Sequence, residues 1–184
     1  MEEELKYKYK YPHPAVAADC AIFGFDGRKV QILLIKRGNY PYEGFWAVPG
    51  GFVNMDETTE SAAIRELKEE TGVTVDNVEL YGVFSKPDRD PRERVITIGY
   101  FTVIHKTDVE GADDAAKADW FDIDNLPRLA FDHDEGVRLA VDRCKELLNH
   151  SESFAKDLLK SFGADEVDAI KCFMNKISVA GCCL

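Results

Sequence analysis

Apolar residues along the chain gather in short blocks separated by polar turns, and three of these blocks predict strands. Residues 15–25 are apolar and bounded by Pro14 and Asp26, residues 29–37 follow as a second block, and residues 95–106 are rich in β-branched and aromatic side chains, which favour a pleated, half-buried surface. The Asp26-Gly27 pair between the first two blocks is a turn signal. We therefore expect a hairpin, followed much later in the chain by a further strand.

Other blocks show the spacing of a helix. Thr58 or Thr59 can cap a helix in which apolar residues recur at helical intervals until Gly72, which is placed to end it. Residues 132–150 carry a second apolar stripe and predict another helix. The remaining residues, 151–184, predict two short helices.

The order of these blocks is strand, strand, helix, strands, helix, which predicts an α/β (α+β) fold with a mixed sheet flanked by helices. At 184 residues the chain is long enough for one well-packed domain and an extension. We place the domain at residues 1–150 and a helical C-terminal extension, broken at Gly163, at residues 151–184. The apolar positions of the extension need burial, either against the domain or against a second subunit in a homodimer.

The charge balance bears on the partners of the protein. The chain has 34 acidic against 23 basic residues and a net charge of −11. Because DNA and RNA are bound through lysines and arginines that displace counterions, an acidic chain without a basic stripe is not expected to bind a nucleic-acid polymer. A small phosphorylated ligand is not excluded in this way, since a bound divalent metal reverses the local charge.

The sequence also bears on cellular location. No apolar run approaches the roughly 18 residues of a membrane span, and the polar N-terminus lacks the apolar region of a secretory signal. The five cysteines are an odd number without the paired spacing of a zinc site, which fits free thiols in a reducing compartment. We therefore predict a cytoplasmic protein that does not bind a membrane.

Three glutamates crowd one surface of the first predicted helix. Glu66, Glu69 and Glu70 stand at positions i, i+3 and i+4 and so occupy one arc beside the apolar stripe. Like charges at this spacing destabilise a bare helix by about 0.2–0.5 kcal/mol per pair. Arg65 supplies one compensating charge, and clustered carboxylates without His or Cys select hard cations such as Mg²⁺ or Mn²⁺. For the glutamates alone, a solvated acidic face is the alternative.

The glutamates belong to a longer pattern. It runs Gly51, five residues, Glu57, seven residues, Arg65-Glu66-Leu67, one residue, Glu69-Glu70, one residue, Gly72-Val73. With average residue usage, a random match at a given start has odds on the order of 10⁻⁹. The pattern resembles the Nudix box at all nine defining positions, and the resemblance to Nudix hydrolases extends from about residue 14 to about residue 149.

Resemblance to the Nudix hydrolases implies an α/β/α sandwich and an enzyme that splits a diphosphate linked to another group. The metal ligands that it implies, for two or more Mg²⁺ or Mn²⁺ ions, are the main-chain carbonyl of Gly50 and the carboxylates of Glu66, Glu69 and Glu70. It also implies that Glu57 pairs with Arg65 and braces the loop against the helix. Such ions neutralise phosphate oxygens, lower the pKa of bound water and align that water with phosphorus.

The identity of the general base stays open. Some residue must take the proton of the attacking water. In the family this is either a glutamate of the box or an acidic residue on a loop before a late strand. Glu69, Asp113 and Asp114 are the candidates here, and an acidic turn without a catalytic role explains the two aspartates equally well.

Four outer segments resemble the bacterial and archaeal ADP-ribose pyrophosphatase branch of the family. They are RGNYPYEGFWAVPGG, PDRDPRERVITIGYF, GADDAAKADWF and LAFDHDE. The reaction that this resemblance implies is ADP-ribose plus water giving AMP and ribose 5-phosphate. The alternatives are a house-cleaning pyrophosphohydrolase acting on nucleoside triphosphates and a non-catalytic sensor of an ADP-ribose-type ligand.

Candidates for binding this nucleotide lie outside the box. They are Arg37, Tyr42, Trp46, Arg92, Arg94 and His133. The arginines can hold phosphates or ribose through forked hydrogen bonds, or they are solvent-exposed charges. The two aromatic residues can stack an adenine or pack in the core. The histidine either contacts the ligand or caps the helix that follows, and we favour the cap.

Overall fold

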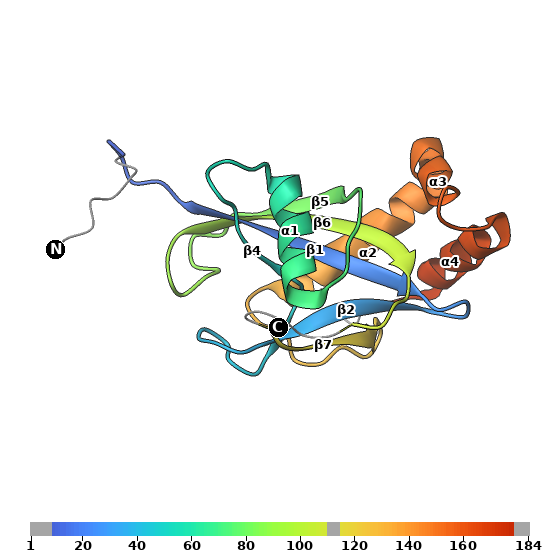
Figure 1. Cartoon of the computed structure of the whole chain (residues 1–184), viewed down its shortest axis with the longest axis horizontal. Helices are drawn as coiled ribbons and strands as arrows, with labels where there is room; N and C mark the ends of the chain where they lie inside the picture. Colours follow the sequence, from blue (N-terminus) through green and yellow to red (C-terminus); the bar gives the residue numbers. More distant parts are fainter. Residues whose placement is uncertain (1–8, 110–114, 179–184) are drawn as a thin grey trace.

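A seven-stranded sheet forms the centre of the protein in the computed structural model, which describes residues 9–109 and 115–178 (Figure 1). The strands are β1 (Ala15–Phe25), β2 (Val30–Arg37), β3 (Trp46–Ala47), β4 (Gly50–Phe52), β5 (Glu79–Phe84), β6 (Val95–His105) and β7 (Ala115–Asp122). Their order is β3-β2-β1-β6-β5, with β4 paired to β1 and β7 paired to β2. β1 and β6 are parallel, whereas the other pairs are antiparallel, so the predicted mixed sheet is confirmed.

The predicted hairpin joins β1 to β2. The Asp26 carboxylate accepts hydrogen bonds from the backbone N–H groups of Arg28 and Lys29, each at 2.9 Å. Gly27 has a φ of 90°, a conformation that residues with a side chain rarely adopt. The Asp26-Gly27 pair therefore forms the turn through side-chain hydrogen bonds to the backbone and through the left-handed conformation of the glycine.

Helices cover both faces of the sheet. The described residues form α1 (Thr59–Thr71), α2 (His133–His150), α3 (Glu152–Leu158) and α4 (Ala164–Lys176). α1 packs on one face, whereas α2 packs on the other, with α3 and α4 beside it on the same side (Figure 1). This is the predicted α/β/α sandwich. Within residues 9–109 and 115–178, no helix combines the length and hydrophobicity needed to cross a membrane.

Strand β1 separates two hydrophobic cores. Cys20 and Ile22 belong to the cluster beneath α1, whereas Ala21, Phe23 and Phe25 belong to the cluster beneath α2. This alternation follows from the two-residue period of a strand, because consecutive side chains point to opposite faces. A strand that is apolar on both faces must be central, which is where β1 lies.

The C-terminal extension completes the core on the α2 side. Its buried members are Phe154, Leu158, Phe162, Ile170 and Met174, and all five belong to the same cluster as the central strands. As the sequence predicts, two helices are separated at Gly163, which is the N-cap of α4. The domain therefore covers these side chains itself. A homodimer, the cytoplasmic location and the division of the chain at residue 150 stay predictions.

Candidate active site

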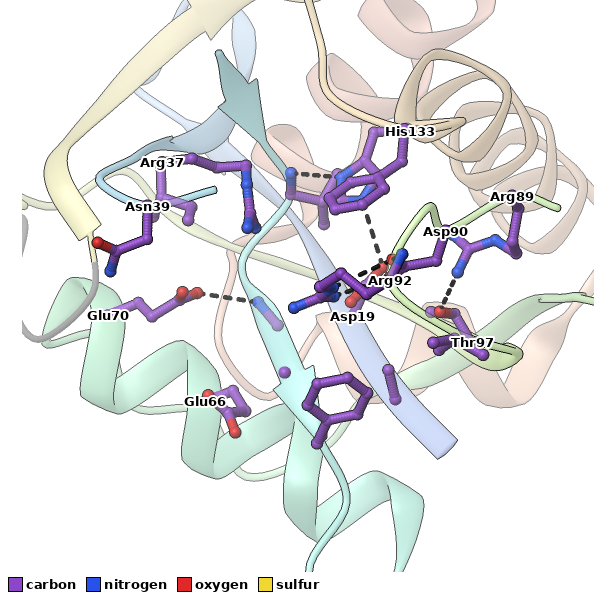
Figure 2. Close-up of a pocket in the computed structure, with 18 of the residues that line it drawn as sticks. Asp19, Arg37, Asn39, Glu66, Glu70, Arg89, Asp90, Arg92, Thr97 and His133 are labelled. Carbon is purple, nitrogen blue, oxygen red and sulfur yellow. Dashed lines mark hydrogen bonds and ion pairs between the residues drawn. The ribbon is translucent and has the colours of Figure 1, made fainter. Parts of the chain in front are cut away.

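A cavity of about 380 Å³ opens where α1, the sheet and two loops meet (Figure 2). Its lining residues come from β1, β2 and the loop that follows it, the segment from Val48 to Asn54, α1, the β5–β6 loop, β6 and the start of α2. The acidic and basic side chains among them are Asp19, Arg37, Glu66, Glu70, Arg89, Asp90, Arg92 and His133. Acidic and basic side chains therefore line the same cavity.

Both ends of α1 are fixed by residues that were predicted from the sequence to begin and end the helix. The Thr58 hydroxyl caps the first turn by accepting a backbone hydrogen bond at 3.1 Å. Gly72 ends the helix with a φ of 74°. Ala63 and Leu67 are fully buried between the helix and the sheet. With its ends and its apolar side fixed, α1 presents its glutamates at defined positions.

Arg65 lies among these glutamates and neutralises part of their charge. Its guanidinium donates to both carboxylate oxygens of Glu57, at 3.0 Å from Nε and 2.7 Å from Nη2. Its Nη1 donates to Glu66 Oε1 at 2.7 Å and to Glu69 Oε2 at 2.9 Å. One arginine thus contacts three carboxylates and ties the loop before α1 to the helix.

We expect acid to weaken the pair between Glu57 and Arg65. Hydrogen bonding to Arg65 lowers the pKa of Glu57 from 4.5 to about 2. Because this pKa lies below that of the unfolded chain, the pair stabilises the fold fully above pH 4.5, and this contribution is lost as the pH falls through 2. Urea unfolding should show Glu57→Gln to be less stable than the unchanged protein near neutrality. A stability difference that does not shrink towards pH 2 would contradict this expectation.

Glu66 and Glu70 turn from α1 into the cavity. Glu70 is 7% exposed and accepts a hydrogen bond from the Gly50 N–H at 2.9 Å. Burial raises the pKa of Glu70 to about 8, although the Gly50 hydrogen bond opposes this. Glu66 lies so close to Gly51 that an added Cβ would come within 2.5 Å of its carboxylate. The Gly50–Gly51 backbone therefore packs directly against the carboxylates of Glu70 and Glu66.

Two arginines approach one aromatic ring in the cavity. The guanidinium carbons of Arg37 and Arg92 lie 5.0 and 5.8 Å from the ring centroid of Phe131. Arg92 is held by Asp90, to which it donates from Nε at 3.1 Å and from Nη2 at 2.7 Å. Burial, and next the charge of Arg92, lower the pKa of Arg37. We call Arg37, Arg92 and Phe131 the basic wall; two neighbouring guanidiniums suit an anionic ligand.

A buried network lies deeper in the cavity, and His133 is the member of it that the sequence analysis singled out. The Arg89 side chain is 5% exposed and donates to both carboxylate oxygens of Asp132 and to the Thr97 hydroxyl. Burial raises the pKa of Asp19 to about 7, although the charge of Arg89 opposes this. Burial also lowers the pKa of His133 to about 4, so that its ring is neutral near pH 7.

His133 does not cap α2, so the interpretation favoured from the sequence is wrong. The N-cap residue is Asp132, which makes no side-chain cap hydrogen bond. The His133 ring instead points into the fold, where Nδ1 accepts a hydrogen bond from the Val48 N–H at 2.9 Å. Its Nε2 lies 3.7 Å from Asp19 Oδ2 (Figure 2). His133 lines the cavity, and its contact with a ligand stays a prediction.

Comparison with known proteins settles the family, because a NUDIX domain model matches residues 13–141. The chain belongs to the Nudix hydrolase family. An ADP-ribose pyrophosphatase from Methanocaldococcus jannaschii is 46% identical over 137 residues, which are 74% of this chain and 79% of that protein. The family predicted from the box is thus confirmed, and α1 is its Nudix helix.

Two further Nudix relatives bear on ligand and fold. The ADPR responsive transcriptional repressor NtrR from Acinetobacter baylyi is 36% identical over 135 residues, which are 71% of this chain and 54% of that protein. The crystal structure of a MutT/nudix family protein from Enterococcus faecalis is 29% identical, with a TM-score of 0.82 over 95% of this chain and 78% of that one. The second match includes most of the C-terminal extension.

The Nudix box offers oxygen donors that suit a hard divalent cation. Carboxylates and a main-chain carbonyl are the ligands that Mg²⁺ and Mn²⁺ prefer. Among the residues that the structure describes, no three His, Cys, Asp or Glu side chains are arranged to hold an ion. Arg65 Nη1 donates to the carboxylates of both Glu66 and Glu69. The donor chemistry fits the family's metal, and a cation has to compete with Arg65 for these two ligands.

The two aromatic candidates do not line the cavity. Trp46 packs edge-on against Phe121, with ring centroids 4.6 Å apart, and joins the core beneath α2. Tyr42 is more exposed and packs edge-on against Phe131 at 4.7 Å, outside the lining residues. Core packing was the alternative considered for Trp46. Stacking of an adenine on either ring stays a prediction.

The remaining candidates are placed less favourably or not described. Arg94 donates to the backbone carbonyls of Lys86 at 3.2 Å and Val95 at 3.3 Å and is not among the lining residues. Asp113 and Asp114 lie outside the described residues. Of the candidates outside the box, Arg37, Arg92 and His133 are therefore the ones that the structure brings to the cavity.

Proposed function

We propose that the protein is a metal-dependent ADP-ribose pyrophosphatase that converts ADP-ribose and water to AMP and ribose 5-phosphate. The observation that carries this proposal is that carboxylates of the Nudix helix share one cavity with the basic wall. A diphosphate requires both, because carboxylates hold cations and guanidiniums bind phosphate oxygens. The archaeal relative that is named an ADP-ribose pyrophosphatase supports this substrate.

In this proposal the box residues hold the metal. The ligands would be the Gly50 carbonyl and the carboxylates of Glu66, Glu69 and Glu70, and the bound cation would neutralise phosphate charge and acidify a water. Arg65 keeps two of these carboxylates close together while no cation is bound, since it donates to both through Nη1. The Nudix helix therefore presents two of the proposed donors close to each other.

The basic wall would orient the substrate. Arg92 is fixed by its two hydrogen bonds to Asp90, which is itself buried, so its remaining donors face a constant direction. Arg37 donates from Nε to the Pro41 carbonyl at 2.8 Å and is fixed in a similar way. Guanidiniums held in place can align the diphosphate with the attacking water at little entropic cost. Glu69, Asp113 and Asp114 remain the candidates for the general base.

A substrate panel with the purified protein tests the proposal. In the presence of Mg²⁺ or Mn²⁺, we expect ADP-ribose to be hydrolysed faster than other nucleoside diphosphate derivatives, with AMP and ribose 5-phosphate formed in equal amounts. A chelator should abolish this activity, and added metal should restore it. Much faster hydrolysis of another derivative would reject ADP-ribose as the substrate. Release of pyrophosphate from nucleoside triphosphates would instead favour the house-cleaning alternative.

The repressor relative favours a second candidate, a sensor that binds ADP-ribose without hydrolysing it. The complete set of box glutamates argues for turnover instead, because binding alone does not need the metal ligands. Calorimetry together with product analysis separates the two. ADP-ribose binding without product in the presence of Mg²⁺, with retention of DNA at moderate salt, would support the sensor.

A further inference from the structure

Three consecutive side chains before and at the start of α2 each contact a residue that lines the cavity. Phe131 lies beneath the arginines of the basic wall, Asp132 binds Arg89, and His133 binds the β3–β4 segment. Phe131 has a φ of 51°, a conformation that a bulky residue adopts only when its surroundings hold it there. None of the three belongs to the Nudix box, yet their contacts with Arg37, Arg89 and Val48 join the start of α2 to the cavity that the box lines.

The contact of His133 bears most directly on the metal site. Val48 is 3% exposed, and its N–H has the His133 ring as its partner at 2.9 Å. The Pro49 carbonyl accepts a hydrogen bond from the backbone of β1 at 2.8 Å, and the Gly50 N–H donates to Glu70 at 2.9 Å. The Val48–Gly50 segment is thus fastened at three successive residues to three separate elements, and His133 provides the fastening to α2.

Building on the proposed function, we propose that His133 is a positioning residue, which holds the Val48–Gly50 segment so that the Gly50 carbonyl stands at the metal site. Val48 donates to Nδ1, so the neutral ring carries its proton on Nε2, which faces Asp19. The ring therefore holds the segment through Nδ1, while its Nε2 lies 3.7 Å from Asp19 Oδ2. Without this acceptor, a buried backbone N–H would lose its partner and the segment would move to find another.

Three substitutions of His133 separate the effect of losing the hydrogen-bond acceptor from the effect of losing the volume of the ring. In His133→Asn the amide oxygen can take the place of Nδ1, whereas in His133→Gln the amide lies nearer the place of Nε2. His133→Leu removes the acceptor and keeps an apolar side chain. His150→Leu, at the exposed far end of α2, is the matched control for placing a leucine on this helix.

Two measurements need no substrate. Hydrogen exchange of the Val48 amide, followed by NMR on the metal-free protein, should be at least about tenfold faster in His133→Leu and close to unchanged in His133→Asn. Mn²⁺ binding, followed by electron paramagnetic resonance, should weaken by about 10-fold to 100-fold in His133→Leu. With ADP-ribose, the Mg²⁺ concentration for half-maximal rate should rise, while KM at saturating metal should change little.

The outcomes are distinguishable. Unchanged Val48 exchange and Mn²⁺ binding in folded His133→Leu would overturn the proposal. Should that variant fail to fold, the comparison of His133→Asn with His133→Gln tests the proposal. His133→Asn must then preserve Val48 protection and Mn²⁺ binding better than His133→Gln does. An equal or reversed order would overturn the proposal. If the unchanged protein does not hydrolyse ADP-ribose, the proposed substrate fails, while the exchange and Mn²⁺ measurements still test His133.

Discussion

Replacing Glu69 by Gln is expected to lower the rate of ADP-ribose hydrolysis by about 100-fold or more. The amide keeps the shape of the side chain but cannot offer an anionic oxygen to a dication or take a proton from water. The fold should change little, because Glu69 is 44% exposed and its contact with Arg65 is a helix-surface ion pair. Steady-state rates with Mg²⁺ and thermal unfolding of the same preparations check both expectations.

Two controls sharpen this experiment. Glu60→Gln removes an exposed carboxylate from the first turn of the same helix, away from the cavity, and should leave the rate unchanged. A titration with Mg²⁺ then separates the two roles considered for Glu69. Loss of a ligand raises the Mg²⁺ concentration needed for activity, whereas loss of the general base lowers kcat at every Mg²⁺ concentration. Near-normal turnover of Glu69→Gln would contradict both roles.

The Nudix helix was predictable because its signals are local. A cap at Thr58, a left-handed end at Gly72 and glutamates at helical spacing all lie within one short segment. The strands β1 and β6 were equally clear, since they are apolar on both faces. Local signals do not reveal which glutamate is buried, however. Glu70 is buried because the Gly50–Gly51 segment, paired to β1, passes directly over it.

The deeper part of the cavity could not be predicted because its contacts are long-range. Arg89 and Asp132 are 43 residues apart, and Val48 and His133 are 85 residues apart. In the sequence, Arg89 is one of several arginines in a polar loop, and Asp132 resembles an ordinary helix cap. Their pairing depends on how the β5–β6 loop folds over the start of α2, which neither segment encodes alone.

The error over His133 has the same origin. Helix starts are enriched in polar residues, so a histidine at the first helical position suggests a role in capping. The ring instead satisfies a buried backbone N–H of a distant segment. The buried N–H that needs a hydrogen-bond acceptor is that of Val48 in the β3–β4 segment and does not belong to the helix. Sequence reasoning placed His133 near the site and failed on what it binds.

Replacing Phe154 by Ala is expected to lower the free energy of unfolding by about 3–5 kcal/mol. Phe154 is the first large side chain of the extension and is 7% exposed. Its ring packs against Phe101 of β6 with the centroids 5.9 Å apart. Removing it leaves a cavity between the extension and the central strands, and neighbouring side chains fixed by the sheet can fill that cavity only in part.

Urea unfolding followed by two probes tests whether the extension and the domain are one cooperative unit. Leu159→Ala, at a 49%-exposed position next to α3, is the control and should change the free energy by no more than about 0.5 kcal/mol. For Phe154→Ala, helix content and tryptophan fluorescence should shift together, since both tryptophans lie outside the extension. A loss of helix at low urea that leaves the fluorescence transition in place would show that the extension unfolds by itself. Because its five buried side chains share a cluster with β1, β2 and β6, we expect the coincident transition.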